Sequence, residues 1–255
     1  MGVRDSHEAG TFSWTDLATP DAQASKEFYG AVFGWDFEDN PIPGDAVYVM
    51  AHIDGRAAAA MFETTDRHPA WASYVTVDDL DGTTARAREL GANVLAEPFD
   101  VMEVGRMSTI QDPTGAVLCL WEPRTSIGAE IVNGPNALSV TQLNTSDTEA
   151  AERFYSELFG WRFESVGDAE TPYWGIYRGE SMNAGMMPLP NGSPAPSHWL
   201  VYFGSEDVDA SAETIGSRGG TMMVEPMDVP PAGRILVAQD PQGAIFALFA
   251  GRFDD

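Results

Sequence analysis

The same eleven-residue pattern occurs twice in this sequence, and this repeat restricts the fold more than any other feature. FYGAVFGWDFE spans residues 28–38 and FYSELFGWRFE spans residues 154–164, an offset of 126 positions. The segments before them also match, because FSWTDLATPD begins at Phe12 and LSVTQLNTSD begins at Leu138. An ordered repeat of this length predicts two similar structural units in one chain.

Further matches extend the repeat to the end of each unit. DPTG at residues 112–115 corresponds to DPQG at residues 240–243. The segment between the two copies contains Gly and Pro, which is typical of a linker. We therefore divide the chain into a tail, two units and a linker, at residues 1–11 (tail), 12–123 (first unit), 124–135 (linker) and 136–250 (second unit).

Within each unit, one pattern of strands and a helix is repeated. In the first half of the first unit, a strand is followed by a helical segment that begins near Pro20 and ends before Gly34. Pro near the start of a helix and Gly after its end are typical boundaries. Three short strands follow, and the pattern then restarts at Trp71. We predict an α+β fold of four βαβββ modules, two in each unit.

Composition excludes several classes of partner. The net charge is −25, which disfavours nucleic acid and anionic membranes as partners. The single cysteine, Cys119, cannot form a disulfide within the chain, and the N-terminus has no apolar signal segment. No apolar run is long enough for a membrane span. These features predict a cytoplasmic protein that acts on, or binds, a small molecule.

The modules resemble those of the vicinal oxygen chelate superfamily, which includes glyoxalase I, extradiol dioxygenases and bleomycin resistance proteins. FYGAVFGW and FYSELFGW resemble its first helix, VDDLDGTTARARELGANV its second, and DPTGAVLCLWEP and DPQGAIFALFAG its final turn and strand. The tandem arrangement is similar to that of actinobacterial members described as glyoxalase-like or hydroxylase-type. The resemblance implies two curved, cup-shaped mixed sheets and a monomer with an internal pseudo-dimer, or a homodimer. It also implies that Phe28, Tyr29, Phe33 and Trp35 pack the first helix onto its sheet.

Most enzymes of this superfamily hold a divalent metal with His and Glu ligands, and the resemblance indicates where those ligands would lie. The matching positions are Trp14, Ala72 and Cys119 in the first unit and Val140, Leu200 and Ala247 in the second. Only Cys119 carries a donor atom, whereas zinc or iron needs three or four converging donors. We therefore expect no metal ligands and no cofactor.

Strand alternation predicts which side chains line each cup. The expected lining of the first cup is Trp14, Asp16, Tyr74, Cys119 and Trp121, and that of the second is Val140, Gln142, Leu200, Tyr202, Ala247 and Phe249. Asp16 and Tyr74 are the candidate catalytic acid and base, if burial raises the pKa of Asp16. Alternatively, Asp16 is solvated or forms an ion pair with Arg106.

Arg106 and Arg234 follow glycines at matching places in the two units. They are candidates for binding an anionic group of a substrate, or for connecting neighbouring strands. The remaining candidates for substrate contact are Trp14, Cys119, Trp121, Gln142, Tyr202 and Phe249.

Three functions fit this pattern of residues. The first is a metal-independent protein that sequesters or carries an apolar or aromatic metabolite. The second is a metal-free enzyme that uses Asp16 and Tyr74 on a ketone, quinone or polyketide-like substrate. The third is a metal-dependent glyoxalase or dioxygenase with atypical ligands. If the protein is an enzyme, we expect a glyoxalase-like lyase or a hydroxylase-type oxidoreductase.

Overall fold

The computed structural model describes residues 2–44, 46–168, 170–190 and 192–252. The first unit forms one sheet in the order β3-β4-β5-β2-β6-β9-β8-β7, and the second unit forms another, along the path β12-β13-β14-β11-β15-β18-β17-β16. Each sheet therefore contains two βαβββ modules from a single unit, which confirms the predicted fold.

The strands of the first sheet are β2 (Phe12–Thr19), β3 (Asp36–Ile42), β4 (Ala46–Ile53), β5 (Arg56–Glu63), β6 (Ala70–Thr76), β7 (Asn93–Val101), β8 (Gly105–Gln111) and β9 (Val117–Pro123). Those of the second are β11 (Leu138–Thr145), β12 (Arg162–Ser165), β13 (Trp174–Arg178), β14 (Ser181–Pro188), β15 (His198–Gly204), β16 (Thr221–Val229), β17 (Gly233–Gln239) and β18 (Ile245–Gly251). The helices are α1 (Ala22–Phe33), α2 (Leu80–Glu89), α3 (Thr148–Phe159) and α4 (Val208–Ser217).

The repeated helix has the same boundaries in both units. Asp21 caps α1 by accepting a hydrogen bond from Ala24 N, and Gly34 ends it in a left-handed conformation with φ 67°. Asp147 and Gly160 do the same for α3, where φ is 69°. Glycine adopts positive φ without a steric penalty, and an aspartate at the N-cap satisfies a free backbone N–H. The identical ends explain why this segment is recognisable twice in the sequence.

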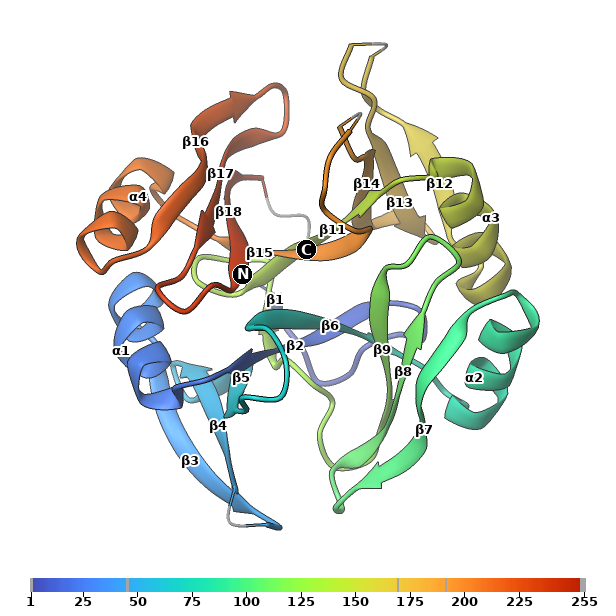
Figure 1. The fold of residues 1–255 in the computed structure, drawn as a ribbon, viewed down its shortest axis with the longest axis horizontal. Coiled ribbons are helices and arrows are strands. Elements are labelled where there is room, and N and C mark those ends of the chain that lie inside the picture. The colour runs from blue at the N-terminus through green and yellow to red at the C-terminus, as the bar shows by residue number, and fades with distance from the viewer. Residues whose placement is uncertain (1, 45, 169, 191, 253–255) are drawn as a thin grey trace.

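The central strands of the two sheets lie back to back, and the outer strands curve away from the centre of the molecule (Figure 1). Helices α1 and α4 lie side by side on one flank, and α2 and α3 lie side by side on the other. The helices cover the outer faces of the curved sheets, so that each concave face is left for side chains from a single unit.

The tail and the linker are more ordered than the sequence suggests. β1 (Gly2–Val3) in the tail pairs with β10 (Ile131–Val132) in the linker, and β10 in turn pairs with β11 of the second sheet. The His7 ring also donates a hydrogen bond of 2.7 Å from Nε2 to Ala129 O. Apart from residue 1, which lies outside the described residues, the predicted tail and linker are thus parts of the second sheet and of the connection between units.

A reciprocal pair of buried hydrogen bonds joins the two units. Tyr29 donates to Asp240 Oδ2 at 2.9 Å, and Tyr155 donates to Asp112 Oδ2 at 2.8 Å. Each tyrosine comes from the repeated helix of one unit, and each aspartate from the DPxG turn of the other. The two motifs that repeat most clearly in the sequence therefore recognise each other across the interface.

The Tyr29 ring lies 5.3 Å from the ring of Trp71 in its own sheet, as expected, and the aromatic residues around Tyr29 also cross the interface. The rings of Tyr29 and Phe246 have centroids 5.5 Å apart, and those of Phe33 and Phe203 are 4.9 Å apart. Burial of aromatic surface is a major source of stability. These residues hold the units together because the fold places α1 between them.

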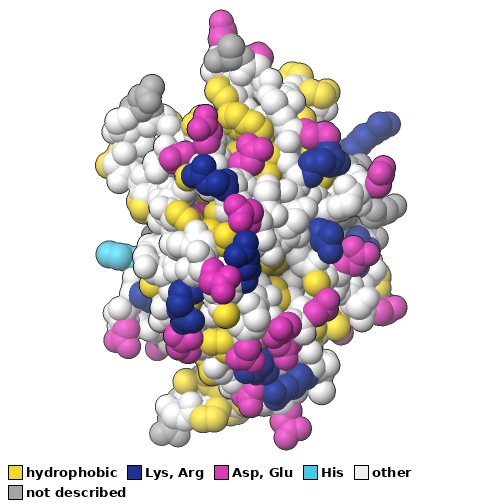
Figure 2. Space-filling model, turned by 90° about the vertical axis from the view of Figure 1, so that its right-hand side faces the viewer, with side chains coloured by type: hydrophobic (Ala, Val, Ile, Leu, Met, Phe, Trp, Pro, Cys, Tyr) yellow, Lys and Arg dark blue, Asp and Glu magenta, His cyan; other side chains and the backbone are white. Residues whose placement is uncertain are grey.

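Ion pairs connect the helices on the second flank. Arg86 on α2 lies 3.0 Å from Glu157 on α3 and 3.1 Å from Glu89. Figure 2 shows basic and acidic side chains alternating over this side of the molecule. Exposed pairs of this kind contribute little stability, on the order of 0–1 kcal/mol each.

Among the described residues, no helix is long and apolar enough to cross a membrane.

Candidate binding site in the first unit

The structure brings the five residues predicted for the first cup together on one face of the sheet. Trp14 on β2 lies opposite Tyr74 on β6, and Tyr74 lies beside Cys119 on β9. Asp16 and Trp121 are each two residues further along their strands, so they share the same face. We call this set of residues the first cup: Trp14, Asp16, Tyr48, Tyr74, Cys119 and Trp121.

The first cup retains a small contact with solvent, in contrast to the opposite face of the same strands. Trp14 and Trp121 are 8% exposed, and Asp16 is 4% exposed. Leu17 and Leu118, which point to the other face, are 0% exposed. These concave side chains therefore keep a slight exposure to solvent, whereas Leu17 and Leu118 have none.

Asp16 is the centre of a buried hydrogen-bond network. Tyr74 and Tyr48 both donate to its Oδ2 atom, at 2.9 and 3.0 Å. Trp14 Nε1 in turn donates to the Tyr48 hydroxyl at 3.0 Å. Within the described residues, no hydrogen-bond donor reaches Asp16 Oδ1. Oδ2 of this carboxylate is thus occupied by the two tyrosines, whereas Oδ1 is available to accept a hydrogen bond from a ligand.

Sequence analysis missed Tyr48. It lies on β4, three strands from β6 in the sheet order, so strand alternation within the strands that carry Asp16 and Tyr74 gives no sign of it. The only signal in the sequence is a tyrosine in a short strand, which is a common residue there. Its place in the first cup follows from the curvature of the sheet.

Burial controls the protonation of this network. Desolvation raises the pKa of Asp16 from 3.8 to about 6, although the hydrogen bonds from Tyr74 and Tyr48 partly oppose this shift. Burial and the nearby Asp16 charge raise the pKa of both tyrosines well above 10, and burial raises the pKa of Cys119 to about 12. At neutral pH the tyrosines and the thiol are therefore uncharged, and Asp16 is the group that titrates.

Arg106 does not reach the first cup, which corrects the two expectations that it contacts substrate there or pairs with Asp16. Its guanidinium lies 2.7 Å from Asp81 at the start of α2 and 3.3 Å from Asp100. Ser108, two residues further along β8 and therefore on the same face as Arg106, forms a hydrogen bond of 2.8 Å with Thr84 of α2. Arg106 is on the helix side of β8, where alternation separates it from the concave face.

Arg234 has the equivalent position in the second unit. It lies 2.8 Å from Asp209 at the start of α4 and 2.9 Å from Asp228. The structure thus assigns both arginines to ion pairs that connect a helix with its sheet. The pairs with Asp100 and Asp228 connect neighbouring strands, which was the alternative to substrate binding in the sequence analysis, and the pairs with Asp81 and Asp209 add the helix.

The concave face of the second unit contains an amide where the first has a carboxylate. Gln142 on β11 corresponds to Asp16, and the Tyr202 hydroxyl donates to its Oε1 atom at 3.3 Å. The register of β13 and β14 places Tyr173 at the position of Tyr48. The remaining lining is apolar. We call this set the second cup: Val140, Gln142, Tyr173, Leu200, Tyr202, Ile235, Val237, Ala247 and Phe249.

The residues of the cups do not fit a metal centre. Throughout the described part of the chain, no three His, Cys, Asp or Glu side chains gather in an arrangement that could hold a metal ion. In the first cup, Asp16 and Cys119 are the potential ligands, and Cys119 is held as a neutral thiol by burial. Two donors, one of them protonated, are fewer than zinc, iron or manganese sites use.

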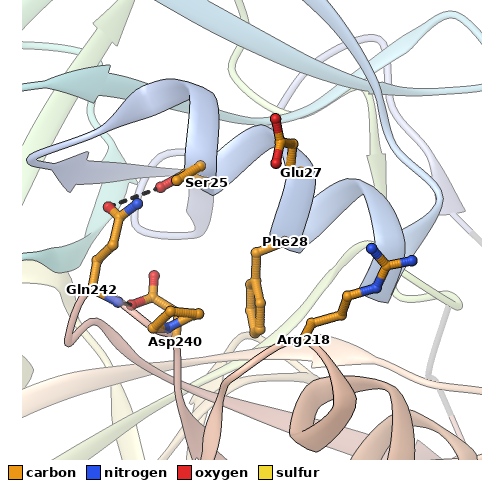
Figure 3. A pocket seen from close by; sticks show the side chains of 8 residues that line it. Ser25, Glu27, Phe28, Arg218, Asp240 and Gln242 are labelled. Carbon is orange, nitrogen blue, oxygen red and sulfur yellow. Dashed lines mark hydrogen bonds between the residues drawn. The ribbon is translucent and has the colours of Figure 1, made fainter.

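A further cavity of about 330 Å³ lies at the interface between the units, near the N-terminal half of α1. Gln242 reaches across it to Ser25 at 3.2 Å, and Phe28 and Asp240 border it (Figure 3). Glu27 and Arg218 lie at its edge, both largely exposed. Because its walls are the inter-unit contacts themselves, we regard it as a gap in that interface.

Comparison with known proteins supports the resemblance seen in the sequence. Residues 11–120 and 137–248 each match the model of the glyoxalase/bleomycin resistance protein/dioxygenase superfamily. The chain is 37% identical over 254 residues to the "putative glyoxylase CFP32" of Mycobacterium bovis, and the match covers 97% of both chains. It is 33% identical over 257 residues to the "anthracycline biosynthesis protein DnrV" of Streptomyces peucetius, covering 94% of this chain and 92% of that one.

Solved structures share the fold at low sequence identity. The 2,2',3-trihydroxybiphenyl 1,2-dioxygenase of Sphingomonas wittichii superposes with a TM-score of 0.69 at 14% identity, covering 97% of this chain and 92% of that one. The Mn(II)-bound glyoxalase of Novosphingobium aromaticivorans gives a TM-score of 0.68 at 15% identity, covering 97% of this chain and 85% of that one. These similarities show the architecture alone.

Proposed function

Because the chain belongs to the glyoxalase/bleomycin resistance protein/dioxygenase superfamily, we propose that its first cup binds an aromatic small molecule, as a metal-independent carrier or sequestering protein. The observation that carries this proposal is the network of Asp16, Tyr48, Tyr74 and Trp14 on the concave face. Apolar walls with a few fixed polar groups are what a small-molecule site requires.

The chemistry of the network selects the ligand class. Asp16 Oδ1 can accept a hydrogen bond from a ligand hydroxyl, because the tyrosines occupy only Oδ2. In the strand register Trp14 is the next concave residue from Asp16, and Trp121 lies two strands away beyond Tyr74 and Cys119, so both tryptophans provide aromatic surface on the same side of Asp16. A planar phenol or hydroxyquinone satisfies both features, since it offers a ring for the tryptophans and a hydroxyl for the carboxylate.

The names of the Streptomyces relatives support this class. Two similar proteins are described as anthracycline biosynthesis proteins. Anthracyclines carry phenol and quinone oxygens on a planar aromatic frame. An aromatic polyketide of this kind is therefore the ligand type that we propose for the first cup.

Acid–base catalysis is the second candidate function, and the raised pKa of Asp16 favours it. A pKa of about 6 is close to the pH at which a carboxylate works best as a general base. Asp16 would accept a proton from a carbon next to a ligand carbonyl, with Tyr74 as the neighbouring hydrogen-bond donor, and would return the proton at another atom of the same molecule. Such a reaction is an isomerisation and needs no other reactant.

A metal-dependent glyoxalase or dioxygenase reaction was the third reading of the sequence. The donor set of the first cup does not support it, because Asp16 is held by two tyrosines and Cys119 is a neutral thiol. We derive no step through a metal for this protein.

Binding of naphthazarin, a planar hydroxyquinone, tests the proposal. Isothermal titration calorimetry should give an affinity that falls at least about tenfold in Trp14→Ala, because the ring loses its stacking surface. Val47→Ala, at an exposed position on β4 outside both cups, is the control and should leave the affinity unchanged. An unchanged affinity in Trp14→Ala would remove the first cup as the site.

Asp16→Asn separates the two candidate functions. For a carrier, the variant should still bind but about tenfold more weakly, because the two tyrosines use its oxygen and the ligand hydroxyl loses the acceptor that Asp16 Oδ1 provides. For an enzyme, the variant should bind and fail to exchange the ligand's acidic C–H for deuterium in D₂O, as measured by NMR. Exchange that persists in Asp16→Asn would exclude Asp16 as the base.

A further inference from the structure

A chain of hydrogen bonds leads from the second cup to its rim. Tyr202 donates to Gln142 Oε1 at 3.3 Å, and Gln142 Nε2 donates to Asn144 Oδ1 at 2.9 Å. Asn144 Nδ2 then lies 3.3 Å from Nε2 of His198, and His198 Nδ1 lies 2.9 Å from Pro196 O. The first unit has no equivalent, since Ala18 and Ala70 occupy the positions of Asn144 and His198.

In this series of hydrogen bonds, each group donates to the next one in the direction from Tyr202 to Pro196. Pro196 O can only accept, so His198 carries its proton on Nδ1 and accepts at Nε2 from Asn144. Asn144 then accepts at Oδ1 from Gln142, and Gln142 accepts from the Tyr202 hydroxyl. Because the Tyr202 proton is used inside the chain, the lone pairs of its oxygen are the part available to a ligand.

The surroundings make this chain the main polar feature of the second cup. Gln142 and Tyr202 are buried, whereas Val140, Ile235 and Phe249 are partly exposed around them. Tyr173, the other titratable group near Tyr202, has its pKa raised to about 12 by burial and stays neutral. Within the described residues, no Asp, Glu, Lys or Arg forms an ion pair with His198. Among Tyr202, Gln142, Asn144 and His198, the imidazole is therefore the one side chain that can take up a second proton and become positively charged.

Protonation of His198 reverses the direction of each hydrogen bond between His198 and Tyr202. A doubly protonated ring must donate at Nε2, which faces the Asn144 amide group. Asn144 satisfies it by turning its oxygen to the ring, and its NH₂ group then faces Gln142. Gln142 turns in the same way and donates to the Tyr202 oxygen. The Tyr202 hydroxyl proton is released from the chain and is free to point at a ligand.

We propose that the second cup binds a neutral aromatic molecule through a hydrogen bond between one ligand oxygen and the Tyr202 hydroxyl. The protonation state of His198, transmitted through Asn144 and Gln142, sets whether Tyr202 accepts or donates in this bond. With neutral His198 the site accepts a hydrogen bond and prefers a hydroxyl compound. With protonated His198 the site donates and prefers a carbonyl compound. This site is separate from the first cup, and its test does not depend on the ligand proposed there.

The tautomer of His198 gives the first test. In protein with ¹⁵N-labelled histidine at pH 8, long-range ¹⁵N–¹H spectra should show the proton of His198 on Nδ1, assigned by its loss in His198→Phe. On acidification to pH 5, the side-chain NH₂ signals of Gln142 and Asn144 should shift together with the His198 ring. A ring that carries its proton on Nε2 at pH 8, or amide signals that do not follow it, would overturn the proposal.

Binding of two matched probes gives the second test. The protein carries Trp14→Ala and Asp16→Asn, so that the first cup contributes neither tight binding nor titration. The carbonyl probe 2-acetonaphthone should bind about tenfold more tightly at pH 5 than at pH 7.5, and 2-naphthol should show the reverse, as expected for one exchanged hydrogen bond. Tyr202→Phe should remove the pH-dependent component for both probes.

His198→Phe should abolish the pH dependence, whereas His68→Phe, which changes an exposed histidine on the first unit, should preserve it. Three results would overturn the proposal. They are affinities that change in the same direction for both probes, a pH dependence that survives in His198→Phe, and no measurable binding of either probe.

Discussion

The buried carboxylate of Asp16 should make the protein less stable at neutral pH than its uncharged variant. The folded pKa of about 6 is above the ordinary value of 3.8. Between these two values the folded protein keeps the proton that the unfolded chain has lost, so stability falls as the pH rises and the loss is complete above about pH 6. Each pH unit is worth 1.36 kcal/mol, so the gap corresponds to about 3 kcal/mol.

Asp16→Asn removes this cost, because the amide is neutral at every pH and its oxygen can still accept from Tyr48 and Tyr74. Urea unfolding should show the variant to be more stable than the natural chain by about 2–3 kcal/mol at pH 8, with the advantage largely gone at pH 3.5. Asp66→Asn, at an exposed position, is the control and should have little effect at either pH. A variant that is less stable at pH 8, or equally stable at both pH values, would refute the reasoning. A residue that destabilises the fold in this way is expected at a functional site.

Three further predictions follow from the structure. Tyr29→Phe and Tyr155→Phe should each lower the free energy of unfolding by about 1–3 kcal/mol, because each leaves a buried aspartate without its inter-unit donor. Denaturant titration measures this change, and an unchanged free energy of unfolding would contradict the role of these bonds. Arg106→Gln should leave naphthazarin affinity unchanged and have little effect on urea unfolding, because its ion pairs lie on the helix side of the sheet. A large loss of affinity would contradict this placement. Treatment with EDTA followed by dialysis should leave naphthazarin binding intact, and calorimetry that shows lost binding, restored by one metal ion, would refute the metal-independent site.

The two-unit architecture and the positions of the helices were accessible from the sequence for local reasons. Capping aspartates, glycines after helices and alternating strands act over a few residues, so Asp21, Gly34 and their counterparts mark the same boundaries in both copies. The same alternation was sufficient to place Trp14, Asp16, Tyr74 and Cys119 on one face. It assigned no face to Arg106, because the sequence around Gly105 does not fix the phase of β8.

The contacts between distant strands and between units depend on tertiary structure. Tyr48 joins Asp16 because the sheet curves, and Tyr29 finds Asp240 because the second unit packs against the first with its turn facing α1. The sequence alone determined that two similar units exist and which faces of their strands are polar, since these are properties of short segments. The tertiary structure decided which polar groups meet. It thereby decided the burial that raises the pKa of Asp16 and the series of hydrogen bonds that connects Tyr202 to His198. Both depend on packing between residues far apart in the sequence.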